Sequence, residues 1–75
     1  MDETELVVRT RKMLRSGLAK ELRLNVGLTL REAGDASGVD HCTILSWENG
    51  LSRGRPALLA KYGRFLLRLE KIAAR

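Results

Sequence analysis

The side chains with the widest chemical repertoire in this chain are its single histidine and single cysteine, His41 and Cys42. They are neighbours in a segment that we predict to be helical, and adjacent helical side chains point in different directions, so we expect them not to face each other. Two potential ligands are also fewer than the three or four protein ligands of a zinc site. The sequence therefore predicts no catalytic site, no metal site and no cofactor.

Basic side chains outnumber acidic ones by 14 to 9, for a net charge of +5, and they are unevenly distributed. Acidic residues gather within the first five positions, whereas residues 9–23 hold six basic side chains against Glu21 alone. A second basic stretch follows between His41 and Lys71. Concentrated positive charge favours a polyanionic partner, either nucleic acid or an anionic membrane surface.

A length of 75 residues corresponds to one domain, with no space for a second domain that carries an effector pocket. We therefore expect no small-molecule ligand. A lone cysteine forms no internal disulfide, and we find neither a secretory signal nor an apolar run as long as a membrane span, so we expect a cytoplasmic protein. A basic amphipathic helix over residues 61–75, lying on a membrane surface, is a remote alternative because aromatic anchors are few.

The N-terminal segment is expected to be helical from Glu3 or Thr4 to Val26, either as one helix or with a break near Ser16 and Gly17. Leucines recur every four residues at positions 14, 18 and 22, which predicts one apolar stripe. Residues 1–13 are either a basic arm or a helical extension along a DNA backbone, and residues 14–75 form the domain proper.

Two short helices are predicted in the middle of the chain, each with its own N-cap. Thr29, with Glu32 three residues later, has capping-box spacing and opens a helix over residues 30–37 that Gly38 ends. Asp40 opens the next helix, over residues 41–49, which Gly50 ends. A short turn that contains glycine is typical of a helix-turn-helix.

The second of these helices is expected to have an inner and an outer face. Val39, Ile44 and Trp47 face inward, and Gly34 in the preceding helix allows close approach of a neighbouring helix. The outward side chains are His41, Cys42, Thr43, Leu45, Ser46 and Asn49.

A last helix is predicted to begin at Pro56, after a loop over residues 51–55, and to extend toward the C-terminus. Its apolar side chains are spaced by three and four residues. Within it, a stripe of Leu59, Leu66, Leu69 and Ile72 either contacts a second copy of the chain or completes the core.

The segments Gly27-Leu-Thr-Leu-Arg-Glu-Ala and Gly38-Val-Asp-His-Cys-Thr-Ile-Leu-Ser-Trp-Glu-Asn-Gly resemble the Cro/repressor-type (XRE-like) helix-turn-helix family, with an actinobacterial or actinobacteriophage flavour. The resemblance covers residues 14–69. It implies a compact, all-α, five-helix lambda-repressor-like domain whose second and third helices form the motif. It also implies an ion pair between Arg23 and Glu48.

The chain departs from the family pattern at four positions in the first motif helix. Leu30, Ala33, Gly34 and Ser37 stand where the family has a glutamine, a larger aliphatic residue, an alanine and an apolar residue. These changes thin the core and remove one backbone contact.

The expected function is sequence-specific binding of double-stranded DNA by a phage-type repressor or Cro-like regulator, in a bacterial cell or a phage-infected host. Base contacts are expected from His41, Cys42, Thr43, Leu45 and Ser46, and phosphate contacts from Thr29, Arg31, Asn49, Arg53 and Arg55. A homodimer on a two-fold operator is expected, because one such domain reads few base pairs. The alternative is an antitoxin or adaptor of the same fold whose main partner is another protein.

Overall fold

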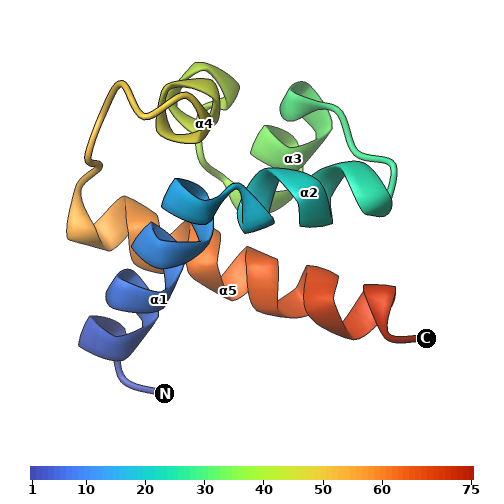
Figure 1. Cartoon of the computed structure of the whole chain (residues 1–75), viewed down its shortest axis with the longest axis horizontal. Coiled ribbons are helices and arrows are strands. Elements are labelled where there is room, and N and C mark those ends of the chain that lie inside the picture. Colours follow the sequence, from blue (N-terminus) through green and yellow to red (C-terminus); the bar gives the residue numbers. More distant parts are fainter.

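The computed structural model describes residues 1–75 and contains five α-helices and no strand. The helices are α1 (Glu3–Ser16), α2 (Leu18–Asn25), α3 (Leu30–Ser37), α4 (His41–Glu48) and α5 (Pro56–Ala73). They surround one hydrophobic core, with α3 and α4 on one side of the molecule and α5 on the other (Figure 1). The predicted all-α, five-helix architecture is confirmed. No helix has both the length and the apolar composition needed to cross a bilayer.

The N-terminal segment is two helices, so of the two arrangements that the sequence left open the structure has the one with a break. Gly17 has a φ of 84°, in the left-handed region that glycine enters without a steric penalty, and it separates α1 from α2. The break makes the expected leucine stripe wrong, because four-residue spacing aligns side chains only within one continuous helix. Leu14 is buried at the end of α1, whereas Leu18 begins α2 and is 50% exposed.

The first helix is part of the core, so residues 3–13 are helical and do not form an arm, and the expected boundary at residue 13 lies within α1. α1 crosses α5 at close range. Thr10 is buried there, and its hydroxyl donates to the Leu6 carbonyl at 2.7 Å. Gly63 of α5 makes the approach possible, since a Cβ at that position would meet the Thr10 hydroxyl and lie 3.0 Å from Leu6 Cδ1.

The two helices predicted to form a helix-turn-helix are α3 and α4, and the structure contains the caps that the sequence predicted for them. Thr29 and Glu32 form a complete capping box, and the Asp40 side chain accepts a hydrogen bond from the Cys42 amide at 3.0 Å. Gly38 ends α3 with a φ of 76°. In Figure 1 the view is nearly along α4 while α3 lies across it, so the two helices cross steeply. The motif uses the third and fourth helices, not the second and third, because the break at Gly17 adds a helix before it.

The turn between α3 and α4 is tightly packed around two small residues. A Cβ at Gly34 would lie 2.9 Å from the Val39 carbonyl oxygen and 3.1 Å from the His41 amide nitrogen, so the predicted close approach is present. Ser37 is buried, donates to the Gly34 carbonyl at 3.4 Å and accepts from the Val39 amide at 3.2 Å. The Gly34 carbonyl also accepts from the Gly38 amide at 2.9 Å, so the serine is needed mainly as the acceptor for the Val39 amide, a partner that an apolar residue would not supply.

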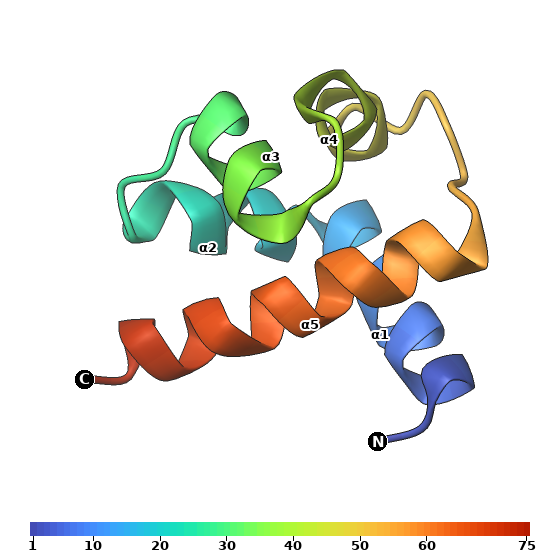
Figure 2. The same cartoon turned by 180° about the vertical axis from the view of Figure 1, so that it is seen from behind.

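The last helix begins at Pro56, as predicted, and runs across the molecule beneath α2, α3 and α4 (Figure 2). Leu59, Leu66 and Leu69 are buried within the chain's own core, and Ile72 is 47% exposed. The stripe therefore completes the core, and a dimer contact through its three leucines is not available. Both termini lie on the side of the molecule away from α3 and α4, which leaves the motif uncovered (Figures 1 and 2).

Candidate nucleic-acid interface

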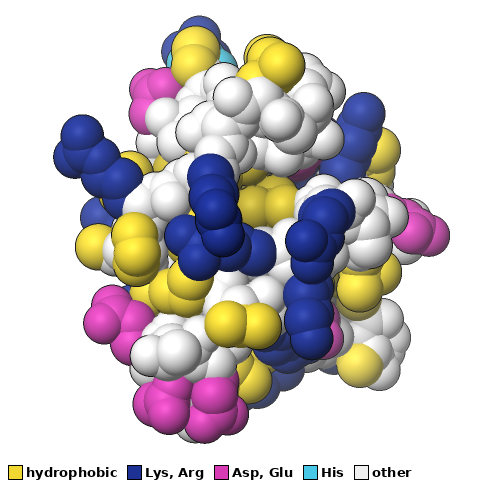
Figure 3. Space-filling model, turned by 60° about the vertical axis from the view of Figure 1, so that its left-hand side comes forward, with side chains coloured by type: hydrophobic (Ala, Val, Ile, Leu, Met, Phe, Trp, Pro, Cys, Tyr) yellow, Lys and Arg dark blue, Asp and Glu magenta, His cyan; other side chains and the backbone are white.

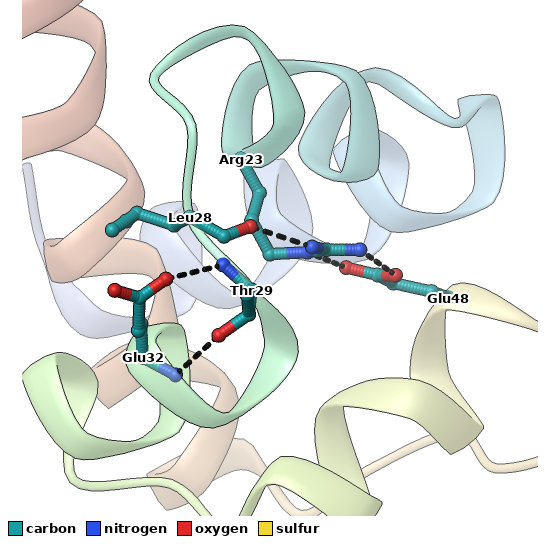
Figure 4. A network of polar contacts seen from close by, with 5 residues as sticks. All are labelled: Arg23, Leu28, Thr29, Glu32 and Glu48. Atoms are coloured by element: carbon teal, nitrogen blue, oxygen red, sulfur yellow. Dashed lines mark hydrogen bonds and ion pairs between the residues drawn. The ribbon is translucent and has the colours of Figure 1, made fainter.

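α4 is fixed to α2 by the expected ion pair. Arg23 Nε donates to Glu48 Oε2 at 2.9 Å, and Arg23 Nη2 donates to Glu48 Oε1 at 3.0 Å. A third bond, from Nη1 to the Leu28 carbonyl at 2.8 Å, links the loop before α3 (Figure 4). The side chains of the pair are 6% and 1% exposed. Because Arg23 donates to the carboxylate, the pKa of its guanidinium is raised above the ordinary value.

Apolar contacts hold the inner face of the same helix. Ile44 and Trp47 are buried, as predicted. The centroid of the Trp47 ring lies 5.8 Å from the centroid of the Tyr62 ring in α5. The loop after α4 closes over the indole, since a Cβ at Gly54 would lie 2.7 Å from Trp47 Nε1. α4 is thus held by contacts with α2, with α5 and with the loop that follows it. None of these contacts uses the outer face of α4.

The outer face of α4 is at the surface. Cys42, Leu45 and Asn49 are exposed, and Leu45 retains 43% of its surface. The other three side chains predicted to face outward, His41, Thr43 and Ser46, are half-buried. No residue of the predicted base-reading set is therefore in the core. An exposed leucine on a rigid helix is suited to contact an apolar group such as a thymine methyl.

The expectation that His41 and Cys42 do not approach each other is wrong. Cys42 Sγ lies 3.6 Å from His41 Nε2, because a long imidazole bridges the angle between neighbouring side chains. With Asp40 they form an arrangement of three potential metal ligands whose donor atoms lie within 4.8 Å of one another. All three come from one helical turn, and the Asp40 carboxylate already caps α4.

The N-terminus of α3 is partly occupied by its own capping box. Thr29 Oγ1 accepts from the Glu32 amide at 3.1 Å, and Glu32 Oε1 accepts from the Thr29 amide at 2.9 Å (Figure 4). Accepting the bond from Thr29 lowers the pKa of the Glu32 carboxyl. The first-turn amides of Leu30 and Arg31 remain as donors, since a helix leaves its first amides without internal partners. The exposed Arg31 side chain lies beside them.

The segment between α4 and α5 carries the remaining predicted phosphate ligands. Asn49 caps the C-terminus of α4, and Arg53 and Arg55 follow in the loop. All three are exposed, and no ion pair occupies either arginine. Cationic side chains therefore lie near both ends of the α3–α4 pair. Arg31 is in the first turn of α3, and Arg53 and Arg55 follow α4.

Comparison of the chain with family models, with curated proteins and with solved structures finds no match. The resemblance to the Cro/repressor-type family therefore depends on the motif residues alone.

Proposed function

We propose that this chain binds double-stranded DNA in a sequence-specific manner, with α4 in the major groove, as a repressor or Cro-like transcriptional regulator. One observation carries the proposal. A short helix is fixed in orientation by a buried ion pair and a buried tryptophan, and its opposite face is exposed between two sets of cationic side chains. A helix held in this way meets the groove without paying an ordering cost at binding.

Base edges are contacted by the N-terminal half and centre of α4. His41 and Ser46 donate or accept hydrogen bonds, Thr43 and Leu45 present methyl groups to thymine, and Cys42 lies next to them on the exposed surface. These are the side chains that distinguish one sequence from another.

Phosphates are contacted at both ends of the motif. The free first-turn amides of α3 near Thr29, together with Arg31, bind one phosphate group, in the manner of helix N-termini. Asn49, Arg53 and Arg55 bind the backbone beyond the other end of α4. These contacts position the domain and carry no sequence information.

A single α4 reads only a few base pairs, so tight specific binding needs two copies on a two-fold site. Because the leucines of α5 are in the core, the copies meet through another surface or bind the two half-sites independently.

The test is selection of bound duplexes from a random pool, followed by titration of the purified chain on the selected duplex at several salt concentrations. We expect enrichment of a short motif repeated with two-fold symmetry about one helical turn apart, roughly 34 Å. Affinity should decrease with salt at a log-log slope of about −0.9 for each phosphate contact. A pool that shows no enrichment after repeated rounds would overturn the proposal, and a stoichiometric protein partner with no DNA binding would favour an antitoxin or adaptor.

A further inference from the structure

A groove of about 680 Å³ lies between the C-terminal half of α1 and the C-terminal end of α4. Its α1 wall contains three basic residues, Arg11, Lys12 and Arg15, together with Val8 and Leu14, and its opposite wall is formed by residues 47–50 with Ser52 and Arg53. Figure 3 shows Lys and Arg side chains gathered at the centre of the face that α1 and the 49–55 loop share. The sequence places these basic residues about forty positions apart, and only the fold brings them together.

The charge of the groove is uncompensated. Glu48 is the one acidic residue in its lining, and its carboxylate is committed to Arg23. Arg9 lies on the same helix but, unlike the basic residues of the groove, it has an acidic partner. Its Nη2 donates to both carboxylate oxygens of Glu70, at 2.6 and 2.7 Å, and Arg9 does not line the groove. Four cations therefore face this space without an acidic partner.

Arg11 is built into the wall of the groove. It is half-buried, and its Nη2 donates to the Gly54 carbonyl at 3.4 Å, which ties α1 to the loop after α4. Its Nε is buried and has no hydrogen-bond partner. A buried donor without an acceptor is costly. An anion bound in the groove would offset this cost through its attraction to the positive charge of the guanidinium.

We propose that this groove seats the phosphodiester backbone of the DNA strand next to α4, so that α1 is a second clamp on the duplex. The inference rests on the proposed function and extends it to a helix outside the motif. Continuity supports the strand as occupant, because Asn49 and Arg53 belong both to the groove and to the proposed phosphate contacts. A neutral organic ligand would leave the four cations of the groove without a counter-charge, whereas the phosphates of a DNA strand supply one.

The test compares two double variants on the selected duplex. Lys12→Ala/Arg15→Ala removes two exposed cations from α1, and Arg64→Ala/Lys71→Ala removes one arginine and one lysine from exposed positions of α5 outside the groove. We expect the α1 variant to bind with a log-log salt slope shallower by about 1.8, from two lost contacts at about 0.9 each. Its order of preference among duplexes should not change, and the α5 variant should keep the wild-type slope. Equal unfolding midpoints, followed by fluorescence of Trp47, verify that both variants fold.

The outcomes separate the two proposals. If the wild type binds its selected duplex but both variants keep its slope, the groove proposal is wrong and binding through α4 stands. If the wild type selects no duplex, the proposed function fails and the groove proposal with it. Inorganic phosphate and a mononucleotide are titrated in parallel by amide NMR. Saturable shifts at the groove with either, together with an unchanged DNA slope in the α1 variant, would make the groove a small-anion site and overturn the inference.

Discussion

Arg23 of α2 and Glu48 of α4 form a two-point ion pair, at 2.9 and 3.0 Å, between residues 25 positions apart in the chain. The same guanidinium donates to the Leu28 carbonyl, so one side chain joins α2, the loop before α3 and the end of α4. The orientation of the candidate recognition helix is therefore set inside the protein.

Removing one partner of this pair should strongly destabilise the fold. Arg23→Met leaves the Glu48 carboxylate, which is 1% exposed, buried without a counter-charge, and we expect the free energy of unfolding to decrease by about 3–5 kcal/mol. Arg23→Met/Glu48→Leu should recover part of this loss. The measurement is urea unfolding followed by fluorescence of Trp47, the one tryptophan in the chain.

The matched control is Arg9→Met, which removes the other ion pair. That pair is only partly buried, with 33% and 39% of its two side chains exposed, and should contribute about 1 kcal/mol or less. Equal destabilisation by the two arginine substitutions would show that burial does not govern the strength of these pairs.

Gly34→Ala tests the close packing of α3 on the start of α4. Alanine in a helix interior would ordinarily stabilise by about 1 kcal/mol relative to glycine. Here its Cβ would lie 2.9 Å from the Val39 carbonyl oxygen, so we expect a net loss of roughly 1–3 kcal/mol as the turn shifts. Asp35→Ala, at the exposed neighbouring position, is the control and should be nearly neutral. A stabilised Gly34→Ala variant would contradict the expected crowding.

Tyr62 should make stability depend on alkaline pH. Burial raises the pKa of its hydroxyl to about 12, so the folded chain keeps this proton in a range where the unfolded chain releases it. The contribution of Tyr62 to the free energy of unfolding should accordingly be constant below about pH 9 and decrease by about 2–3 kcal/mol as the pH rises from about 10 to about 12. Circular dichroism during urea unfolding at each pH measures it.

Tyr62→Phe is the reference for that experiment, because it should lack this part of the decrease. The Tyr62 hydroxyl is buried without a hydrogen-bond partner, so its removal should leave stability at pH 7 unchanged or raise it by up to about 1 kcal/mol. A large loss at pH 7 would mean that the hydroxyl has a partner, such as a bound water molecule.

The proposed interface separates residues that read sequence from residues that bind backbone. His41→Ala or Ser46→Ala should change the preferred base at one position of each half-site, at a cost of about 1–3 kcal/mol if a good contact is lost. Arg53→Ala should weaken binding to all duplexes alike. Competition binding with a set of single-base variants distinguishes the two effects. If all three substitutions act alike, this division of roles is wrong.

Several parts of the fold were predictable because they depend on hydrogen bonds between near neighbours. The capping box of Thr29 and Glu32, the cap at Asp40 and the stop at Gly38 join residues at most three or four positions apart. Such bonds form wherever the local sequence permits them, so the bounds of α3 and α4 could be predicted to within one residue.

The leucine stripe, by contrast, was predicted wrongly because its four-residue spacing continues across Gly17. Spacing does not reveal whether a glycine bends the chain, since α1 and α2 are redirected by their separate packing on α5. The contact between Cys42 and His41 was missed for a related reason. It depends on the rotamers of two side chains, which their order in the chain does not fix.

The amino-acid sequence by itself determined that the chain is helical, where its short central helices begin and end, and which face of α4 is apolar. Only the tertiary structure decided that α1 is a core helix, that the leucines of α5 are consumed within one chain, and that Arg11, Lys12 and Arg15 lie opposite Arg53. The reason is the distance along the chain over which each interaction acts. Caps and periodicity depend on residues within one or two helical turns, whereas the burial of a side chain depends on how all five helices pack together.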